Sequence, residues 1–221
     1  MKFSTMHWFT YIIPKTILKT GSSYNRDIRV VEESGEYKLL VNGSTETGPY
    51  IKKLLIYAFK KFNISKEKNV NTILVLGVAG GTIIHMFHTL YPHAQITGVD
   101  IDAVMLSLGK KYFGLSDIPQ LSLIVADAKD FVQRSKKNSY DCIVIDLFIG
   151  REIPAFESSV EFLTSLKSLL SPHGFVFINY LKELEYGLKP SGMTKTLQKI
   201  FSTVKYVDHE YNRFFLAKKS F

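Results

Sequence analysis

An apolar run that leads directly into a glycine-rich loop is the feature that most constrains this chain. Residues 71–82 read Asn-Thr-Ile-Leu-Val-Leu-Gly-Val-Ala-Gly-Gly-Thr, so Gly77, Gly80 and Gly81 follow a segment with the composition of a buried strand. Residues 83–90 are expected to form a helix. A loop with few side chains, set before a helix N-terminus, brings free backbone N–H groups close to a ligand. The pattern predicts a βαβ unit that binds a nucleotide.

The next predicted strand supports this interpretation, because it ends in an acidic residue. Asp100 follows the apolar run 95–99 and lies roughly 20 residues after Gly77, the spacing at which βαβ nucleotide folds place the acid that binds the ribose hydroxyls. Alternatively, Asp100 only caps a helix that begins at Asp102. The loop upstream favours ribose binding.

The loop also narrows the kind of nucleotide. The dinucleotide fingerprint has glycine at its first, third and sixth positions, which here are Gly77, Ala79 and Thr82. Two of these three positions are not glycine, which argues against binding of NAD or FAD. No Gly-Lys-Ser/Thr follows, so the phosphate-binding Walker pattern is absent as well. A nucleoside without a pyrophosphate remains, and S-adenosylmethionine is the commonest such cofactor on this architecture.

Composition and charge limit the class of protein. A chain of 221 residues, 46% of them apolar, can bury one α/β core with a small appendage. The formal charge is +8, but the lysines come in scattered pairs such as Lys52-Lys53 and Lys110-Lys111. Such pairs indicate a solvated surface rather than a nucleic-acid-binding face. The charge attracts anionic partners and repels a polyamine, unless a local acidic pocket overrides it.

Cysteine, histidine and hydropathy exclude further classes. Cys142 is the single cysteine, so a disulfide framework within one chain is excluded. His85 and His88 lie three residues apart with His93 beyond them, but no carboxylate or cysteine nearby completes a metal site, and no metal is expected. No apolar stretch approaches the roughly 20 residues that span a bilayer. We expect a cytoplasmic protein without a signal peptide or membrane anchor.

The order of predicted elements indicates an α/β fold with a mostly parallel sheet. A hairpin is expected over 28–41, around Ser34-Gly35, and a helix from Pro49 to Phe62. From residue 71 onward strands and helices alternate, which implies right-handed crossovers. We divide the chain into an N-terminal β-hairpin appendage, 1–48, and a Rossmann-like domain, 49–221. The expected strands are 72–76, 95–99, 121–125, 140–145, 174–179, 203–207 and 213–217, and the later helices are 82–91, 102–112, 128–136, 156–170 and 193–201.

Several motifs resemble the spermidine synthase family, especially its methyltransferase-like members. The similarity extends over roughly residues 28–218 and implies the class I methyltransferase fold, with a C-terminal hairpin closing the sheet. It also implies an adenosyl cofactor and a homodimer. The motifs are Leu74–Thr82, Gly98–Asp102, Lys111–Leu115, Ala126–Ala128 and Tyr140–Asp146.

The resemblance implies roles for seven residues around the cofactor. The three loop glycines would lie under its sulfonium end, and Asp100 would take the ribose hydroxyls. Ile101 would pack on the adenine face, while the Asp127 carboxylate and the Ala128 N–H would bind the adenine edge. Asp127 is equally suited to cap the helix that follows it. The seven residues are Gly77, Gly80, Gly81, Asp100, Ile101, Asp127 and Ala128.

The same resemblance places a catalytic acid and an acceptor wall. Asp146, at the end of the fourth strand, occupies the position of the family's catalytic acid, although it could instead satisfy a loop backbone. Phe148, Asn179 and Tyr180 follow or close strands four and five and are candidates for the acceptor wall. Asp141 is expected to be a solvated residue at the edge of its strand.

Departures from true spermidine synthases favour methyl transfer from intact S-adenosylmethionine. Those enzymes carry an aspartate where this chain has Gly80, and a second acid after the position of Asp146 that is missing here. In the segment that follows the N-terminal hairpin, residues 41–48, where those enzymes carry a Gln and an Asp-Glu pair, only Glu46 remains as a carboxylate. Aminopropyl transfer from decarboxylated S-adenosylmethionine is the alternative, and a non-catalytic protein that binds a nucleoside or a partner is a third. The acceptor is expected to be a small molecule or a protein.

Overall fold

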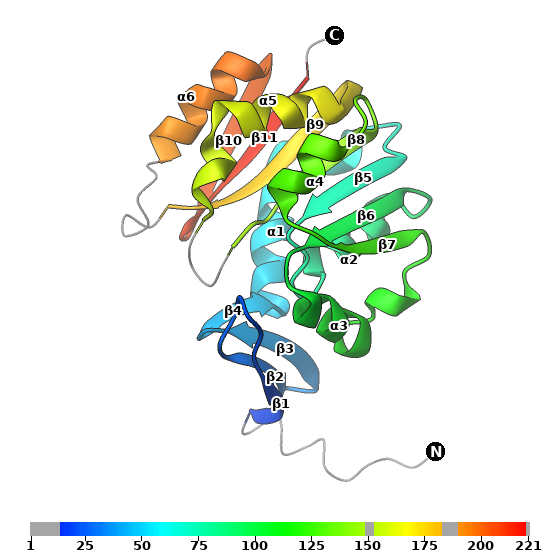
Figure 1. The fold of residues 1–221 in the computed structure, drawn as a ribbon, viewed down its shortest axis with the longest axis vertical. Coiled ribbons are helices and arrows are strands. Elements are labelled where there is room, and N and C mark those ends of the chain that lie inside the picture. Colours follow the sequence, from blue (N-terminus) through cyan, green and yellow to red (C-terminus); the bar gives the residue numbers. More distant parts are fainter. Residues whose placement is uncertain (1–13, 149–152, 183–189, 220–221) are drawn as a thin grey trace.

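The apolar runs of the chain form a seven-stranded sheet around which the molecule is built (Figure 1). The computed structural model describes residues 14–148, 153–182 and 190–219. The strand order is β10-β11-β9-β8-β5-β6-β7, with β5 to β9 parallel and the final hairpin antiparallel. The strands are β5 (Thr72–Leu76), β6 (Gln95–Asp100), β7 (Leu121–Val125), β8 (Tyr140–Ile145), β9 (Leu170–Leu181), β10 (Thr203–His209) and β11 (Asn212–Lys218).

Helices cover both faces of this sheet. Adjacent residues of a strand face opposite sides, so in β5 the side chains of Ile73 and Val75 pack toward α1 and α2, while Leu74 and Leu76 pack toward α4, α5 and α6. Burial on both faces explains why these strands read as continuous apolar runs. None of the described helices is long and apolar enough to cross a membrane. The helices are α1 (Pro49–Phe62), α2 (Thr82–Leu90), α3 (Ala103–Tyr112), α4 (Ala128–Arg134), α5 (Val160–Leu169) and α6 (Pro190–Ile200), with short 3₁₀ turns η2 (Ile64–Lys66), η3 (Leu115–Asp117) and η4 (Ala155–Ser158).

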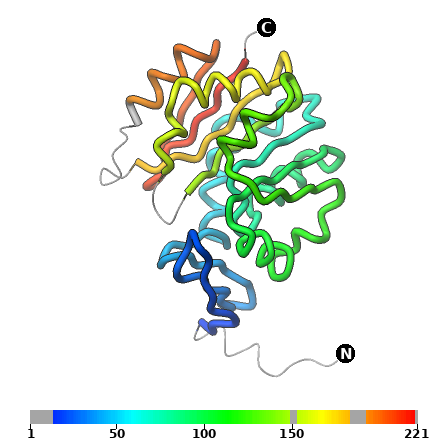
Figure 2. The backbone as a smooth tube through the Cα atoms, in the orientation of Figure 1, coloured from blue at the N-terminus to red at the C-terminus, as the bar shows by residue number. Residues whose placement is uncertain are grey.

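A separate four-stranded antiparallel sheet precedes α1 and packs beside α3 (Figure 2). Its central strands are the predicted hairpin, turning at Ser34-Gly35, where both residues have positive φ. The apolar side of this hairpin contacts Met105 and Leu108 of α3. The strands are β1 (Lys15–Thr20), β2 (Ile28–Glu33), β3 (Glu36–Val41) and β4 (Ser44–Thr47).

The predicted α/β class with a mostly parallel sheet is confirmed, with differences at four elements. The helix expected over 156–170 is a 3₁₀ turn followed by α5, because the Ser159 hydroxyl accepts a hydrogen bond from the N–H of Phe162 and begins a new helix there. Strand β9 begins at Leu170 rather than near 174. Strands β1 and β4 were not predicted, because they are short and polar, without a clear apolar alternation.

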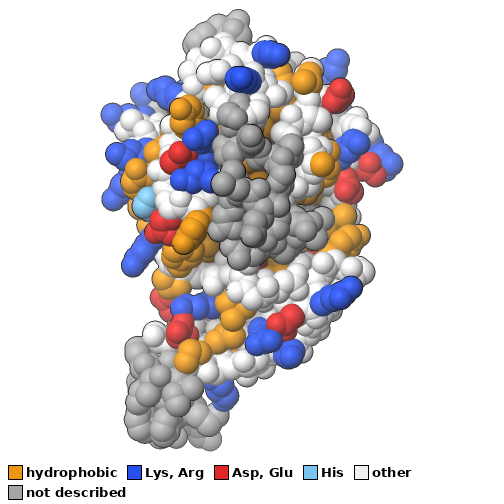
Figure 3. All heavy atoms as spheres, turned by 90° about the vertical axis from the view of Figure 1, so that its left-hand side faces the viewer, with side chains coloured by type: hydrophobic (Ala, Val, Ile, Leu, Met, Phe, Trp, Pro, Cys, Tyr) orange, Lys and Arg blue, Asp and Glu red, His pale blue; other side chains and the backbone are white. Residues whose placement is uncertain are grey.

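Basic side chains are spread over the surface rather than gathered. Figure 3 shows lysine and arginine side chains distributed over one face, interspersed with acidic and apolar side chains. Several are paired locally, as Arg213 is with Asp208 and Lys218 is with Glu67. On this face the net charge of +8 does not form one continuous basic patch.

Asp141 connects the starts of three strands, so its expected solvated position was wrong. Its Oδ2 accepts hydrogen bonds from the N–H groups of Asn71 and Thr72, at 2.9 and 3.1 Å, and from the Thr72 hydroxyl at 3.0 Å. Its Oδ1 accepts from the Ser171 hydroxyl at 2.7 Å. Burial alone would raise the pKa of Asp141, but the hydrogen bonds from Ser171, Asn71 and Thr72 outweigh it and lower the pKa.

We expect Asp141→Ala to lower the free energy of unfolding at pH 7 by about 1–3 kcal/mol, because it leaves several donors unpaired. The lowered pKa means that this stabilisation is present above pH 4 and is lost as the pH falls below it. Urea unfolding at pH 7 and pH 3 measures both effects. The matched control is Asp117→Ala, at an exposed aspartate. A loss that is equal at both pH values would contradict the assignment.

Candidate functional site

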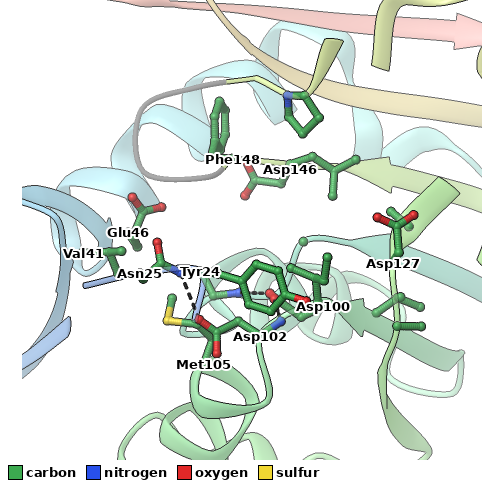
Figure 4. Close-up of a pocket in the computed structure, with 18 of the residues that line it drawn as sticks. Tyr24, Asn25, Val41, Glu46, Asp100, Asp102, Met105, Asp127, Asp146 and Phe148 are labelled. Carbon is green, nitrogen blue, oxygen red and sulfur yellow. Dashed lines mark hydrogen bonds between the residues drawn. The ribbon is translucent and has the colours of Figure 1, made fainter. Parts of the chain in front are cut away.

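A cavity lies at the carboxyl ends of β5, β6 and β8, where open α/β sheets bind ligands (Figure 4). Its walls come from the glycine-rich loop, the segments after β6, β7 and β8, and the N-terminal sheet. Figure 4 shows Glu46, Asp146 and Phe148 on one side of it and Asp127 on the other. The predicted site residues that line it are Gly77, Asp100, Ile101, Asp127, Ala128, Asp146 and Phe148.

Asp100 holds the glycine-rich loop in place. Its Oδ2 accepts hydrogen bonds from the N–H groups of Val78 and Ala79, at 2.9 and 3.2 Å, and its Oδ1 accepts from the N–H of Asp102 at 2.9 Å. Burial raises the pKa of Asp100, and these backbone hydrogen bonds oppose the rise. The carboxylate therefore has a structural role within the cavity wall, and its contact with a ribose stays a prediction.

Gly77 allows two strand ends to approach each other closely. Its φ is +85°, and a Cβ atom built there would lie 2.0 Å from the carbonyl oxygen of Asp146. No other residue fits this backbone without moving the end of β8. Ala79 also has a positive φ, +46°, a conformation that is uncommon for residues other than glycine, and its N–H donates to Asp100. The loop is thus shaped by contacts within the protein.

Gly80 and Gly81 are not among the residues that line the cavity, and their place beneath the cofactor stays a prediction. A Cβ at Gly80 would lie 2.6 Å from a methyl of Thr47, and one at Gly81 would lie 2.4 Å from a methyl of Leu115. The first glycine lets the N-terminal sheet approach the loop, and the second lets η3 do so. Their lack of side chains serves packing in this structure.

Asp127 begins α4 and faces the cavity at the same time. Its Oδ1 accepts a hydrogen bond from the N–H of Asp130 at 3.1 Å, so the capping role is confirmed. Asp127, Ala128 and Ile101 line the cavity together. Their predicted contacts with adenine stay predictions, and the capping bond leaves the second carboxylate oxygen available for such a contact.

A second pocket adjoins the first and shares Glu46, Asp146 and Phe148 with it. It is enclosed by β4, α1, β9 and the tip of the closing β10–β11 hairpin. Phe148 and Asn179, which are predicted for the acceptor wall, line it, and their contact with an acceptor stays a prediction. Sequence reasoning did not include the hairpin tip, Tyr211 and Asn212, which also lines it.

Tyr180 lies away from both pockets, so its predicted place in the acceptor wall was wrong. It follows Asn179 in β9 and therefore faces the opposite side of the sheet. There it is fully buried in the cluster beneath α5 and α6, with its ring 6.2 Å from that of Phe215.

Two carboxyl groups, those of Glu46 and Asp146, line both pockets where the pockets join. Burial, with a smaller contribution from the charge of Asp100, raises the pKa of Asp146 to about 6 against an opposing 2.8 Å hydrogen bond from the Asn179 amide. Burial also raises the pKa of Glu46 to about 8, with further contributions from Asp146 and Asp100. Glu46 was noted in the sequence as the remaining carboxylate of its segment, but only the folded N-terminal sheet brings it opposite Asp146.

The junction is therefore suited to a cation and to proton transfer. Carboxyl groups with raised pKa values accept a proton near neutral pH, and a cation between them stabilises their ionised forms. In the part of the chain that the structure describes, no three His, Cys, Asp or Glu residues are grouped so that they could hold a metal ion. His85 instead places Nε2 2.6 Å from the carbonyl oxygen of Phe113.

Known proteins similar to this chain include both aminopropyltransferases and methyltransferases. A polyamine aminopropyltransferase of Vibrio vulnificus is 30% identical over 73% of this chain and 46% of its own length. The eEF1A lysine and N-terminal methyltransferase of Bos taurus is 34% identical over 54% of this chain and 18% of its own length. The chain thus spans less than half the length of these relatives.

A solved structure and a family model agree with this result. Human methyltransferase-like protein 13, in complex with SAH, superposes with a TM-score of 0.62 at 23% identity, covering 76% of this chain and 82% of that one. This likeness shows the class I methyltransferase-like fold. The model of the spermine/spermidine synthase domain matches residues 57–209, well over half of the sequence. The chain belongs to the spermine/spermidine synthase domain family.

Proposed function

We propose that this protein transfers a methyl group from S-adenosylmethionine to the amino group of an acceptor. The observation that carries the proposal is the junction of the two pockets, where Glu46, Asp146 and Phe148 belong to both walls. A donor in the first pocket and an acceptor in the second would meet at this point. The comparisons support a transferase of this family, with relatives that carry out either methyl or aminopropyl transfer.

The residues of the first cavity suit an adenosyl group. Ile101 and Met105 provide apolar contact for a flat base, Asp127 offers a carboxylate for an exocyclic amino group, and Asp100 lies where a ribose is expected. When bound, S-adenosylmethionine supplies a methyl group on a cationic sulfur, which reacts by in-line displacement. The protein then has to orient an acceptor nitrogen and exclude water.

The acceptor pocket favours an amine that carries a single charge. Among the described residues that line it, the acidic ones are Glu46 and Asp146. Two carboxyl groups match one ammonium, whereas a polyamine carries several charges whose burial requires further partners. The bovine relative is named for lysine and N-terminal methylation, and both acceptors are single amino groups. We infer that the acceptor is a primary amine of a protein or small molecule.

The two carboxyl groups have distinct tasks in this proposal. Asp146, with its pKa near 6, accepts a proton from the ammonium and leaves a neutral nitrogen whose lone pair attacks the methyl carbon. The carbon–sulfur bond breaks and its electron pair stays on sulfur. Glu46 keeps the incoming ammonium at the junction, since its pKa falls once a cation lies beside it.

The first prediction from the proposed function concerns the methyl donor. Calorimetric titration with S-adenosylmethionine, its decarboxylated form and NAD should show the tightest binding for intact S-adenosylmethionine and none for NAD. Assays with a lysine-containing peptide and with putrescine then separate methyl from aminopropyl transfer. Preference for the decarboxylated form together with transfer to putrescine would establish the aminopropyltransferase instead. Failure to bind either adenosyl compound would favour a non-catalytic protein.

The second prediction separates the two roles of Asp127. Asparagine caps helices as well as aspartate, so Asp127→Asn should keep the melting temperature while losing the carboxylate. We expect adenosyl binding to weaken by about 1.5–3 kcal/mol, the scale of a hydrogen bond to a charged group. Asp127→Ala should lose both binding and about 1 kcal/mol of stability. Unchanged calorimetric affinity in both variants would remove Asp127 from the cofactor site.

The third prediction concerns Glu46 and pH. Because its folded-state pKa is raised from 4.5 to about 8, its contribution to stability is present below pH 4.5 and is lost as the pH rises to 8. We expect Glu46→Gln to match the wild type near pH 4.5 and to be more stable at pH 8, the slopes differing by at most about 1.4 kcal/mol per pH unit.

Thermal unfolding across this pH range measures the effect of Glu46→Gln. Glu36→Gln is the matched control, because Glu36 belongs to the same sheet but is exposed. Parallel stability curves for the wild type and Glu46→Gln would show that Glu46 does not titrate with a raised pKa.

A further inference from the structure

A chain of two amides leads from the tip of the C-terminal hairpin to Asp146. The Nδ2 of Asn212 donates to the Oδ1 of Asn179 at 2.7 Å, and the Nδ2 of Asn179 donates to the Oδ1 of Asp146 at 2.8 Å. Both asparagines are buried, with 8% of Asn179 and 7% of Asn212 exposed. The two residues come from different strands, β9 and β11, so the chain links separate parts of the molecule to the acid.

The direction of this chain follows from chemistry. An ionised carboxylate only accepts hydrogen bonds, so Asn179 must present its NH₂ group to Asp146. The amide oxygen of Asn179 then faces Asn212, which must present its own NH₂ group. The reverse order needs a protonated Asp146 that donates to the oxygen of Asn179. The arrangement with Asn212 as the first donor therefore matches the ionised acid.

Asn212 is held in place independently of Asp146. It follows the two-residue turn Glu210-Tyr211, which joins β10 to β11. The Tyr50 hydroxyl of α1 donates to the Glu210 carboxylate at 2.6 Å, and the ring of Tyr57, also in α1, stacks on His209 at 4.0 Å. With the turn fixed from outside, Asn212 can impose an orientation on Asn179.

We propose that Asn212 is a positioning residue for Asp146, which acts by fixing the Asn179 amide with its N–H toward the acid. The orientation stands on the described contacts alone, while its effect on turnover rests on the proposed function. Without Asn212, the oxygen of Asn179 is left without this donor inside the protein, and rotation of the amide would turn that oxygen toward the carboxylate.

The surroundings of Asp146 make this donor important. Burial and the charge of Asp100, from β6, disfavour the ionised form of Asp146. The carboxyl groups of Glu46 from β4 and Glu157 from η4 also interact electrostatically with it, and the charge of Asp146 raises their pKa values. Glu157 is fully buried, and neither of its oxygens has a hydrogen-bond partner among the described residues. Tyr50 and Tyr211 complete the titratable lining of the acceptor pocket. The hydrogen bond from Asn179 favours the ionised form of Asp146 against burial and the charge of Asp100.

The test compares Asn212→Leu, Asn179→Leu and the double variant by the carbon-13 NMR titration of the Asp146 side chain in the free protein. In Asn212→Leu the midpoint should rise by several tenths of a pH unit to about one unit, which is up to a tenfold change in proton affinity. Asn179→Leu should raise it at least as much. The midpoint in the double variant should equal that in Asn179→Leu, because Asn212 acts through Asn179.

A matched control separates this effect from general damage to the hairpin. Arg213 follows Asn212 in β11 and forms an exposed ion pair with Asp208 of β10. Arg213→Leu removes this ion pair and should leave the Asp146 titration unchanged. If Asn212→Leu fails to fold, Asn212→Ala removes the same donor with less added volume. An unmoved midpoint in the folded Asn212 variant, or shifts that add in the double variant, would overturn the proposal.

The outcome is distinct from that of the proposed function. The NMR titration needs neither cofactor nor acceptor. A raised midpoint with no detectable methyl transfer keeps the positioning role and removes the function. Robust methyl transfer by the wild type, with an identical pH profile of kcat in Asn212→Leu, keeps the function and removes the positioning role. If both hold, kcat in Asn212→Leu should fall at pH values near 6, with KM for the cofactor unchanged.

Discussion

The carboxylate of Asp100 is the interaction on which the site depends. By accepting hydrogen bonds from Val78, Ala79 and Asp102, it ties the loop after β5 to the start of α3, across the ends of two neighbouring strands. A fixed loop lets Gly77 lie directly against the backbone of Asp146, at the end of a third strand. One half-buried acid thus sets the relative positions of three strand ends, and the cavity is the space that they enclose.

The N-terminal sheet completes the site that the larger sheet begins. Asp102 caps α3 with one oxygen and accepts with the other from Ser22 and from Asn25, the latter at 3.0 Å, so the small sheet is joined to the segment that follows Asp100. Gly80 permits the close approach of Thr47, and the neighbouring Glu46 then reaches the junction of the pockets. The second carboxyl group of the site is therefore supplied by a part of the chain far from Asp146 in sequence.

The large sheet could be predicted almost completely from the sequence, because strands that are buried on both faces are recognisable as continuous apolar runs. The sequence also identified seven of the residues that line the cavity, since strand ends and glycine loops leave local patterns. What it missed depends on contacts between distant segments. Gly80 and Gly81 resemble ligand-binding glycines in the sequence, but in the structure a side chain at these positions would clash with Thr47 and Leu115. Tyr180 follows Asn179, and only the known orientation of β9 shows which of the two faces the pocket. Asn212 and Asp141 act through partners more than 30 residues away, or on other strands, where no spacing rule applies.

The positive charges of the surface and the carboxyl groups at the junction of the pockets act over different distances. At physiological ionic strength, interactions between exposed charges are largely screened beyond about 8 Å, so the scattered lysines act weakly on a group inside the pocket. Glu46, Asp146 and Glu157 lie in surroundings that raise their pKa values, where a charge nearby has a much larger effect than it has in water. In the proposed function, the junction therefore selects for a cation although the chain as a whole is basic. Without that cation, the carboxyl groups take up protons, which avoids the free-energy cost of burying ionised carboxylates. In the proposed reaction, an incoming ammonium reverses this and ionises Asp146, which then accepts the proton of that ammonium.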